Sequence, residues 1–403
     1  MGDHANELDL ALPRRIALVH DWLSAYVGGE RVLEQMIALY PDADVFTSVD
    51  VLPKAERAFL QGKTPITSFA QEWPLVRKHY RHFLPLLMIA VEQLDVGECE
   101  LVLSSSSAIG KGVIVGPDQL HIAYVHSPMR YAWDLQHQYL REAGLTRGAR
   151  AMLARWLLHK ARLWDMRTAN GVDHFIANSH FIARRIWRVY RREAAVIHPP
   201  VDVHGFALRE HKDDFYLTAS RLVPYKKVPA IVEAFRGLPG RRLVVVGDGS
   251  EMRQVKAAAG PNVEILGYQP TAALRDLMQR AKAFVFAAEE DFGIAPVEAQ
   301  ACGTPVIAYG RGGALETVRD TGPRASGIFF HAQTPAAIAA AVQEFERREH
   351  EFAPRAARDN ALRFGADLFK ERYRRFVQGR WEEFRAQRAP RSSAALAPVR
   401  AYG

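Results

Sequence analysis

The sequence predicts an α/β fold with two Rossmann-like domains, each a doubly wound parallel sheet, facing each other across a central cleft. Three observations predict it. Short apolar runs alternate with helical patterns in the first half of the chain, and the same alternation returns in the second half. Such alternation is typical of parallel sheets with helices on both faces. The length of 403 residues provides for two hydrophobic cores.

The first half begins its alternation at an apolar run over residues 16–20, which ends in a loop containing Gly28 and Gly29. Apolar residues then recur at helical spacing between residues 32 and 37, which predicts a helix. Further apolar runs predict the remaining strands of this half, at 45–49, 101–104, 121–125 and 174–177.

The second half repeats the pattern after a polar stretch with Pro and His at 199–213, where a domain boundary fits. The sequence therefore predicts an N-terminal domain over 13–205 and a C-terminal domain over 206–361. The tail 389–403 is rich in Pro, Ala and Ser and is expected to be disordered. The expected strands of the second half are 215–219, 242–246, 263–266, 283–287 and 305–308.

Composition agrees with a globular enzyme, with 48% hydrophobic and 24% charged residues. No apolar run approaches the ~20 residues of a transmembrane helix. Residues 1–12 lack the cationic start and apolar stretch of a signal peptide, so a cytoplasmic location is expected. The two cysteines, Cys99 and Cys302, form no disulfide framework or metal-site pattern.

The net charge of +8 needs a physical reason, and arginines are concentrated in segments 77–81, 141–167 and 184–192. Nucleic acid, anionic lipid and a phosphorylated substrate are the candidates. No nucleic-acid-binding module is present. Tryptophans and arginines in the expected helix 152–164 fit peripheral contact with an anionic membrane, or equally an ordinary helix with one apolar face in the core.

Polar residues follow several expected strands, and ligands of doubly wound sheets bind at the carboxyl ends of strands. Arg221 and Lys226 can converge on one anion, since arginine offers a planar fork and lysine a point charge. Lys227 is adjacent, but spacing favours Lys226. The strand-end loops that could line one cleft carry Gly28 and Gly29, His126, Arg221, Lys226 and Glu290.

Glu290 and Glu298 are separated by seven residues, between an apolar strand and a helix. This arrangement puts one carboxylate in a strand-end loop and the other inside the following helix, so both can accept hydrogen bonds from a ligand rich in hydroxyls. His126 can bond a sugar hydroxyl or carry a proton. His20 and Asp21, at the end of the first strand, are further candidate contacts of an acceptor.

Together the Glu-x7-Glu segment with its Asp-Phe-Gly turn, the Arg-Leu-Val-x-x-Lys segment at Arg221 and the His-Ser-Pro segment at His126 resemble retaining glycosyltransferases of family 4, which have the two-domain GT-B architecture. The resemblance covers roughly residues 14–384. It implies that a helix over 362–388 packs back on the N-terminal domain. It also implies that Arg221 and Lys226 stabilise a departing diphosphate.

The same resemblance implies a role for each remaining site residue. His126 would contact the transferred sugar, Glu290 the sugar hydroxyls, and Glu298 the ribose of the nucleotide. The remaining donor contacts would be the loop of Gly28 and Gly29 and the backbone N–H groups of Phe292, Gly293 and Ile294.

Within the family, segments 124–140 and 220–228 look most like bacterial mannosyltransferases of O-antigen or exopolysaccharide synthesis. The expected reaction is retaining transfer of mannose from GDP-mannose to a polyprenyl-diphosphate-linked saccharide, by front-face displacement. No metal or other cofactor is expected: the Asp42-Ala43-Asp44 motif precedes a strand, which places it at the wrong sheet edge.

Three alternatives stay open. The chain could be a transferase of the same family that uses a UDP-sugar, or a nucleotide-sugar 2-epimerase, which shares the two-domain architecture. A non-enzymatic protein could use the arginines alone to bind an anionic surface. Partners under the favoured interpretation are a nucleotide sugar and a lipid-linked saccharide, at the inner face of the plasma membrane.

Overall fold

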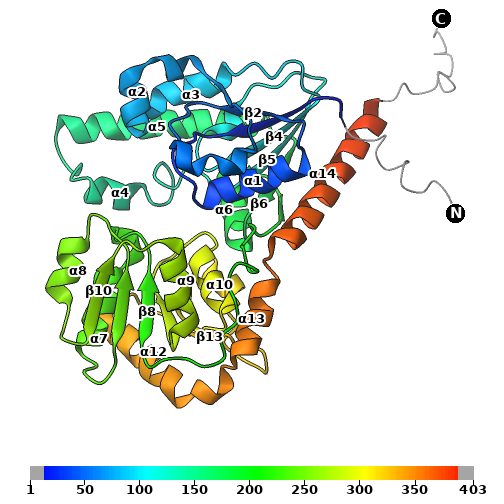
Figure 1. The fold of residues 1–403 in the computed structure, drawn as a ribbon. Helices are drawn as coiled ribbons and strands as arrows, with labels where there is room; N and C mark the ends of the chain where they lie inside the picture. Colours follow the sequence, from blue (N-terminus) through cyan, green and yellow to red (C-terminus); the bar gives the residue numbers. More distant parts are fainter. Residues whose placement is uncertain (1–12, 389–403) are drawn as a thin grey trace, which may run out of the picture.

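The computed structural model describes residues 13–388, which form two parallel-sheet domains stacked one above the other (Figure 1). The N-terminal sheet has seven strands in the order β3-β2-β1-β4-β5-β6-β7, and every pair is parallel. Its strands are β1 (Ile16–His20), β2 (Asp44–Thr47), β3 (Ile66–Thr67), β4 (Leu101–Ser106), β5 (Leu120–Val125), β6 (His174–Ala177) and β7 (Ala194–Val196).

Helices cover both faces of this sheet. The expected apolar face of α1 is buried, with Val32, Leu33, Met36 and Ile37 in one core. The helices of this domain are α1 (Gly28–Leu39), α2 (Pro74–His79), α3 (Leu84–Glu92), α4 (Gln136–Glu142), α5 (Ala149–Ala169) and α6 (His180–Tyr190). None of the helices in the described part of the chain is long and apolar enough to span a membrane.

The C-terminal sheet has six parallel strands in the order β10-β9-β8-β11-β12-β13. These are β8 (Tyr216–Ala219), β9 (Leu243–Val246), β10 (Val263–Gly267), β11 (Ala283–Phe286), β12 (Val306–Tyr309) and β13 (Gly327–Phe330). The helices are α7 (Val228–Arg236), α8 (Met252–Ala258), α9 (Thr271–Arg280), α10 (Ile294–Ala301), α11 (Ala314–Thr317), α12 (Pro335–Arg347) and α13 (Pro354–Leu362).

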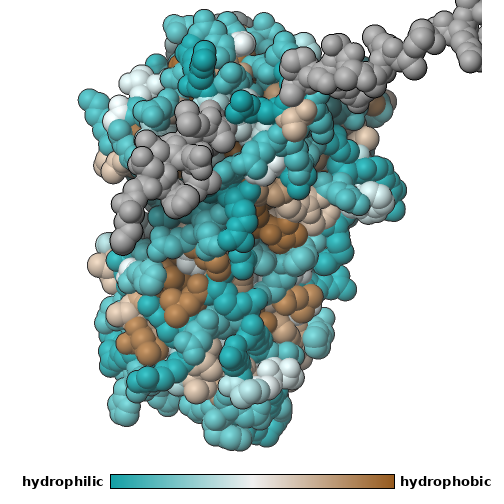
Figure 2. All heavy atoms as spheres, turned by 90° about the vertical axis from the view of Figure 1, so that its right-hand side faces the viewer, coloured by the Kyte–Doolittle hydropathy of each residue, from teal (hydrophilic) through white to brown (hydrophobic). Residues whose placement is uncertain are grey.

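The last helix, α14 (Ala366–Arg388), leaves the C-terminal domain and packs on the N-terminal domain (Figure 1). Phe369, Tyr373, Val377 and Trp381 are buried in the same core as α1. Figure 2 shows this side of the molecule, which is mostly hydrophilic with small separate apolar patches. The predicted disordered tail 389–403 lies outside the described residues.

The fold class predicted from the sequence is confirmed. Three short strands were not predicted, namely β3, β7 and β13, and they lie at the edges of the two sheets. The first sheet ends at Val196 and the second begins at Tyr216, whereas the exact domain boundaries stay a prediction. Because all strands in each sheet are parallel, the loops at their carboxyl ends gather at one edge of each sheet.

Candidate active site

Lys226 and Glu290, from two different strand-end loops, form an ion pair in the C-terminal domain. Lys226 ends the short 3-10 turn η7 (Pro224–Lys226) after β8, and Glu290 follows β11. The Lys226 ammonium also lies over the rings of Tyr225 and Phe286, at 5.3 and 5.6 Å from the ring centroids. The structure therefore brings together the cation and the carboxylate that the sequence placed in one site.

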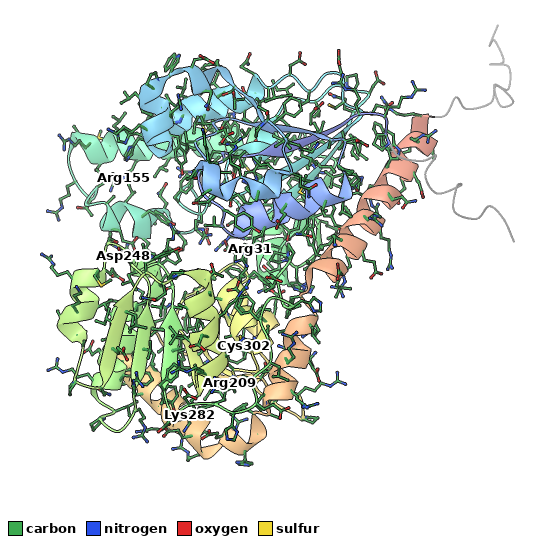
Figure 3. The ribbon with its side chains drawn as sticks, in the orientation of Figure 1. Arg31, Arg155, Arg209, Asp248, Lys282 and Cys302 are labelled. Atoms are coloured by element: carbon green, nitrogen blue, oxygen red, sulfur yellow. The ribbon has the colours of Figure 1, made fainter. Side chains whose placement is uncertain are left out.

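Arg221 is exposed, and none of residues 13–388 forms an ion pair or hydrogen bond with its side chain. The turn after β9 packs against the backbone of the loop that carries Arg221. A Cβ on Gly247 would lie 1.8 Å from Ser220 O, and one on Gly249 would lie 2.4 Å from Leu222 O. Only glycine permits this approach, so the Gly-Asp-Gly turn supports the loop that carries Arg221 (Figure 3 labels Asp248).

Glu298 contacts the opposite domain. It lies on α10, is 7% exposed, and its Oε1 is 2.7 Å from Nη1 of Arg31 on α1. Figure 3 shows Arg31 on the side of α1 that faces the C-terminal domain. The sequence analysis did not select Arg31. Its position could have indicated this contact, because Arg31 lies two residues after Gly29, in the first turn of a helix at the cleft.

Gly28 and Gly29 begin α1, at a contact between the two domains. A Cβ on Gly28 would lie 3.2 Å from Cδ1 of Ile294, at the start of α10. A Cβ on Gly29 would lie 3.4 Å from Cε1 of His20 and 3.7 Å from Nε2 of His126. Both glycines, His126 and Ile294 are thus brought together by the fold.

The pKa values of the two histidines beside Gly29 are shifted in opposite directions. His126 bonds Ser105 Oγ at 2.9 Å, and burial, followed by the field of His20, lowers the pKa of His126 to about 4. Burial also opposes protonation of His20, but the Glu30 carboxylate, 3.6 Å away, more than offsets it and the pKa of His20 is raised. The Nδ1 atom of His20 is buried without a partner in the described structure.

Asp21 was predicted as a candidate contact of an acceptor, and this interpretation is wrong. Its carboxylate is 3% exposed and accepts bonds from Ser106 Oγ, from Ser107 N and Oγ, and from three further backbone N–H groups at residues 108–110. These bonds use its acceptor capacity. Asp21 therefore anchors the loop after β4 and has no free face toward a ligand.

Asp291 holds the loop after β11 against the N-terminal domain. Its carboxylate contacts Arg130 Nη2 at 2.5 Å and Arg185 Nη1 at 3.0 Å, and Ser179 Oγ donates to its backbone oxygen at 2.6 Å. Burial raises the pKa of Asp291, while the two guanidinium groups oppose that rise. These contacts were not predicted, since they join residues more than 100 positions apart.

A second carboxylate, Glu316 on α11, joins the C-terminal domain to the start of α6. Glu316 accepts from the backbone N–H groups of His180 and Phe181 at the start of α6, both at 2.9 Å, and lies 3.0 Å from His198 Nε2. The turn before it packs so tightly that a Cβ on Gly313 would lie 2.3 Å from Cα of Phe292.

The backbone around Phe292, Gly293 and Ile294 has unused donors. Gly293 has a φ of 88° and precedes α10, and no acceptor in the described residues bonds these three N–H groups. N–H groups at the start of a helix, next to a loop of this kind, favour an anion. The geometry is compatible with the predicted role of the three residues, which stays a prediction.

A pocket of about 550 Å³ opens between α4 and the η7 loop, so the two domains share it. Neither Lys226 nor Glu290 lines it, but their neighbours Tyr225 and Asp291 do. Its other walls include Arg130, Tyr139, Phe181, Arg185, Lys227 and Glu289.

Within the described residues, no group of three or more His, Cys, Asp or Glu side chains is arranged to hold a metal ion. Asp44 of the Asp-x-Asp motif begins β2 and lies 3.4 Å from Arg15 Nη2, at the amino end of its strand. Independence from metals stays a prediction.

Residues 203–362 match the family model described as glycosyl transferases group 1. D-inositol 3-phosphate glycosyltransferase of Mycobacterium marinum is 28% identical over 265 residues, which are 56% of this chain and 57% of that protein. The enzyme of the same name from Mycobacterium avium is 28% identical over 181 residues, 39% of this chain and 43% of the relative. The chain thus spans about half the length of the curated relatives it matches.

Solved structures resemble the whole described chain. Anabaena HepE in complex with UDP superposes with a TM-score of 0.66 at 17% identity, covering 91% of this chain and all of that one. Sucrose-phosphate synthase from Thermosynechococcus elongatus has a TM-score of 0.68 at 17% identity, covering 92% and 99%. At such identities the likeness shows the fold, which is GT-B. The segment 203–362 is therefore similar to the glycosyl transferases group 1 family, within a chain of GT-B fold.

Proposed function

We propose that this protein is a retaining glycosyltransferase that moves mannose from GDP-mannose onto a polyprenyl-diphosphate-linked saccharide, at the inner face of the plasma membrane, in the synthesis of a bacterial surface polysaccharide. One observation carries the proposal of sugar transfer. The Lys226–Glu290 pair lies in the C-terminal domain, and Ile294, which follows the same loop after β11, approaches Gly28 of the N-terminal domain, next to Gly29 and His126.

The ion pair would exchange partners when the donor binds. Lys226 would turn to the diphosphate, and Glu290 would accept hydrogen bonds from the hydroxyls of the sugar. The unpaired Arg221 and the N–H groups of residues 292–294 supply further positive potential for the same anion. Negative charge grows on the diphosphate as the sugar departs, so these groups stabilise the transition state more than the ground state.

Front-face displacement accounts for retention without a protein nucleophile. The acceptor oxygen bonds C1 of the sugar on the face from which the diphosphate leaves, the bond between C1 and the phosphate oxygen breaks, and the acceptor proton passes to that oxygen. His126 is uncharged at neutral pH because burial lowers its pKa to about 4. It would therefore orient a sugar hydroxyl without repelling an oxocarbenium-like centre.

Glu298 would accept the ribose hydroxyls. Its Oε1 is already bonded to Arg31, so a ribose would share this carboxylate and use its remaining lone pairs. Fixed cations and backbone donors would do the work that a metal does elsewhere, so no cofactor is required.

A UDP-sugar is the second candidate donor. HepE was crystallised with UDP and with UDP-glucose, and the curated relatives act on D-inositol 3-phosphate by name. These proteins share the fold or part of the sequence, which supports a nucleotide sugar in general. GDP and mannose rest on the local resemblance of segments 124–140 and 220–228.

A thermal-shift panel of GDP-mannose, UDP-glucose and ADP-glucose tests the donor, because a ligand that binds the folded state raises Tm. We expect GDP-mannose to raise Tm most. A larger shift with UDP-glucose would replace the donor and keep the transfer reaction, and equal shifts would remove the assignment.

Product analysis separates the reaction classes. Incubation with the donor alone should leave the sugar unchanged or slowly hydrolysed, and an epimer would support the 2-epimerase instead. Incubation with lipid-linked acceptor should give an α-glycoside from an α-linked donor, in the presence of EDTA as well as without it. Anionic-surface binding that persists in Lys226→Ala, with no turnover in wild type, would favour the non-enzymatic alternative.

A further inference from the structure

An apolar stripe runs along the outer face of α5. Met152, Trp156, Leu163 and Met166 are 72%, 55%, 54% and 37% exposed. Their spacing of four, seven and three residues puts them on one face of the helix, over about 21 Å of its axis. We call these four residues the α5 stripe.

The α5 stripe is not the core face of this helix. Ala161, Asp165 and Thr168 are the buried positions toward the sheet, and Trp164 packs so closely on Gly112 that an added Cβ would lie 2.4 Å from its ring. The sequence left two interpretations of segment 152–164, an ordinary helix packed on the core and a helix with an apolar face for a membrane, and α5 has the features of both. It has an inner face that joins the core and a second apolar face in solvent.

Exposed cations lie on α5 and in the segment before it, and apart from Arg167, which pairs with Glu92, they lack an acidic partner in the described residues. Between residues 143 and 170 the only acidic residue is Asp165, which is fully buried and paired with Lys111 at 2.7 Å. In the described structure, no carboxylate pairs with the exposed Arg147, Arg150, Arg155 or Lys160. Figure 3 labels Arg155 on the side of α5 toward α4, and its Nη2 donates to the carbonyl oxygen of Thr146, in the loop between these helices, at 3.0 Å.

Further large apolar side chains are exposed on and beside the neighbouring helices α2 and α3. Glu92 at the end of α3 accepts from Trp164 Nε1 at 2.6 Å, which ties α3 to α5, and Ile89 one turn earlier is 52% exposed. Before α2, Trp73 is 51% exposed and Leu75 in its first turn is 61% exposed. All three helices lie on one side of the N-terminal domain (Figure 1).

We propose that the α5 stripe and the cations beside it form a docking surface for an anionic lipid bilayer. Tryptophan and long apolar side chains enter the boundary between headgroups and acyl chains, while arginine and lysine contact lipid phosphates. A polyanion such as nucleic acid would satisfy the cations but leave four large apolar side chains in water. The combination of both chemistries selects a bilayer.

Docking through α5 would also place the cleft beside the membrane. α4, which lines the interdomain pocket, directly precedes α5 in the chain. A lipid-linked acceptor could then reach the pocket without leaving the bilayer. Binding to the bilayer itself does not depend on the proposed sugar transfer.

Co-sedimentation of the full chain with vesicles tests the proposal, in the absence of any nucleotide sugar. We expect binding to vesicles of phosphatidylglycerol and phosphatidylcholine, at least tenfold weaker binding to phosphatidylcholine alone, and a blue shift of tryptophan fluorescence that Trp156→Phe removes in large part. Failure to bind anionic vesicles, or equal binding to both kinds, overturns the proposal.

Two sets of variants locate the surface. The first set removes apolar contact and combines Met152→Gln, Trp156→Gln and Leu163→Gln. The second set removes positive charge and combines Arg150→Gln, Arg155→Gln and Lys160→Gln. Each set should weaken vesicle binding about tenfold. The matched control changes the same charge on α14, at Arg372, Arg374 and Arg375, and should change binding less than twofold. Equal weakening by the control set would show that net charge alone drives binding.

Further measurements keep the outcomes distinct. Circular dichroism and Tm show whether each variant is folded. If the stripe variants alter the oligomeric state in analytical ultracentrifugation and leave vesicle binding unchanged, the surface binds protein and the proposal fails. Lys226→Ala should slow sugar transfer by about 10²–10³-fold yet bind vesicles like wild type, so the two proposals fail independently.

Discussion

Arg31 and Glu298, 267 positions apart in the chain, bond each other across the interdomain cleft with Nη1 and Oε1 at 2.7 Å. The carboxylate is 7% exposed, so the N-terminal domain covers the residue expected to hold the nucleotide ribose. The pair therefore links the donor site to the approach of the two domains.

Arg31→Met should lower stability, because it leaves the Glu298 carboxylate buried without its partner. A loss of about 1–3 kcal/mol is expected for such a group. Denaturant unfolding measures it, and the KM for the donor should rise. Arg31→Lys keeps the charge and should lie between wild type and Arg31→Met; an unchanged KM in all three would separate the pair from donor binding.

Lys226→Ala should reduce kcat by about 10²–10³, the range observed when one preorganised charge-stabilising group is removed. Steady-state kinetics with the donor found by the thermal-shift panel gives the number. Lys227→Ala is the matched control, since Lys227 is adjacent and pairs with no carboxylate in the described residues. If the control loses as much activity, the assignment of Lys226 is wrong.

The two histidines at Gly29 should titrate on opposite sides of pH 6.5. NMR of labelled histidine should place His126 near a pKa of about 4 and His20 above its ordinary value. A raised pKa in the folded state stabilises fully below the unfolded pKa and less as pH rises through the folded one. The stability difference between wild type and His20→Asn should therefore be largest below pH 6.5 and fade at higher pH. A midpoint of His126 near 6.5 would contradict its burial.

Gly28→Ala should reduce kcat/KM several-fold with little change in Tm. The added Cβ lies 3.2 Å from Cδ1 of Ile294, so the domains must separate by a few tenths of an ångström or the side chain must turn. Ile294→Val removes that atom, and the double variant should recover much of the lost activity. An additive double-mutant cycle would show that the two residues do not interact in the reaction.

Asp21→Asn should be the most destabilising of these changes. The carboxylate accepts six bonds from the loop after β4, and the amide group of asparagine would face donors with a donor of its own. Loss of several buried bonds to a charged acceptor costs about 3 kcal/mol or more. Calorimetry should show the lower Tm, whereas a stable, inactive variant would restore the role in acceptor binding.

The sequence predicted the fold well because its signals are local. The apolar runs that became β1, β9 and β11 are continuous in the chain, and α1 shows helical spacing over a single segment. β3 has only two residues and β7 three, too few for a periodic pattern. Such short edge strands are defined by their neighbours and not by their own residues.

The site was predictable only where a motif is continuous. Glu290, Glu298 and the Arg221–Lys226 loop could be selected from short segments, and the structure pairs Lys226 with Glu290. Asp291 with Arg130 and Arg185 could not be selected, since these contacts exist only after two distant segments meet. Asp21 was misinterpreted for the same reason: its donors come from residues 106–110, and nothing near Asp21 reveals them.

The return of α14 has a consequence for synthesis of the chain. Phe369 and Tyr373 complete the apolar interior around Tyr124. Their ring centroids lie 5.9 and 6.4 Å, respectively, from the ring centroid of Tyr124. The N-terminal domain therefore lacks α14 until the whole C-terminal domain has been synthesised. Until then the apolar surface that α14 will cover is exposed to solvent. A fragment that contains only the N-terminal domain would need α14 added as a separate peptide.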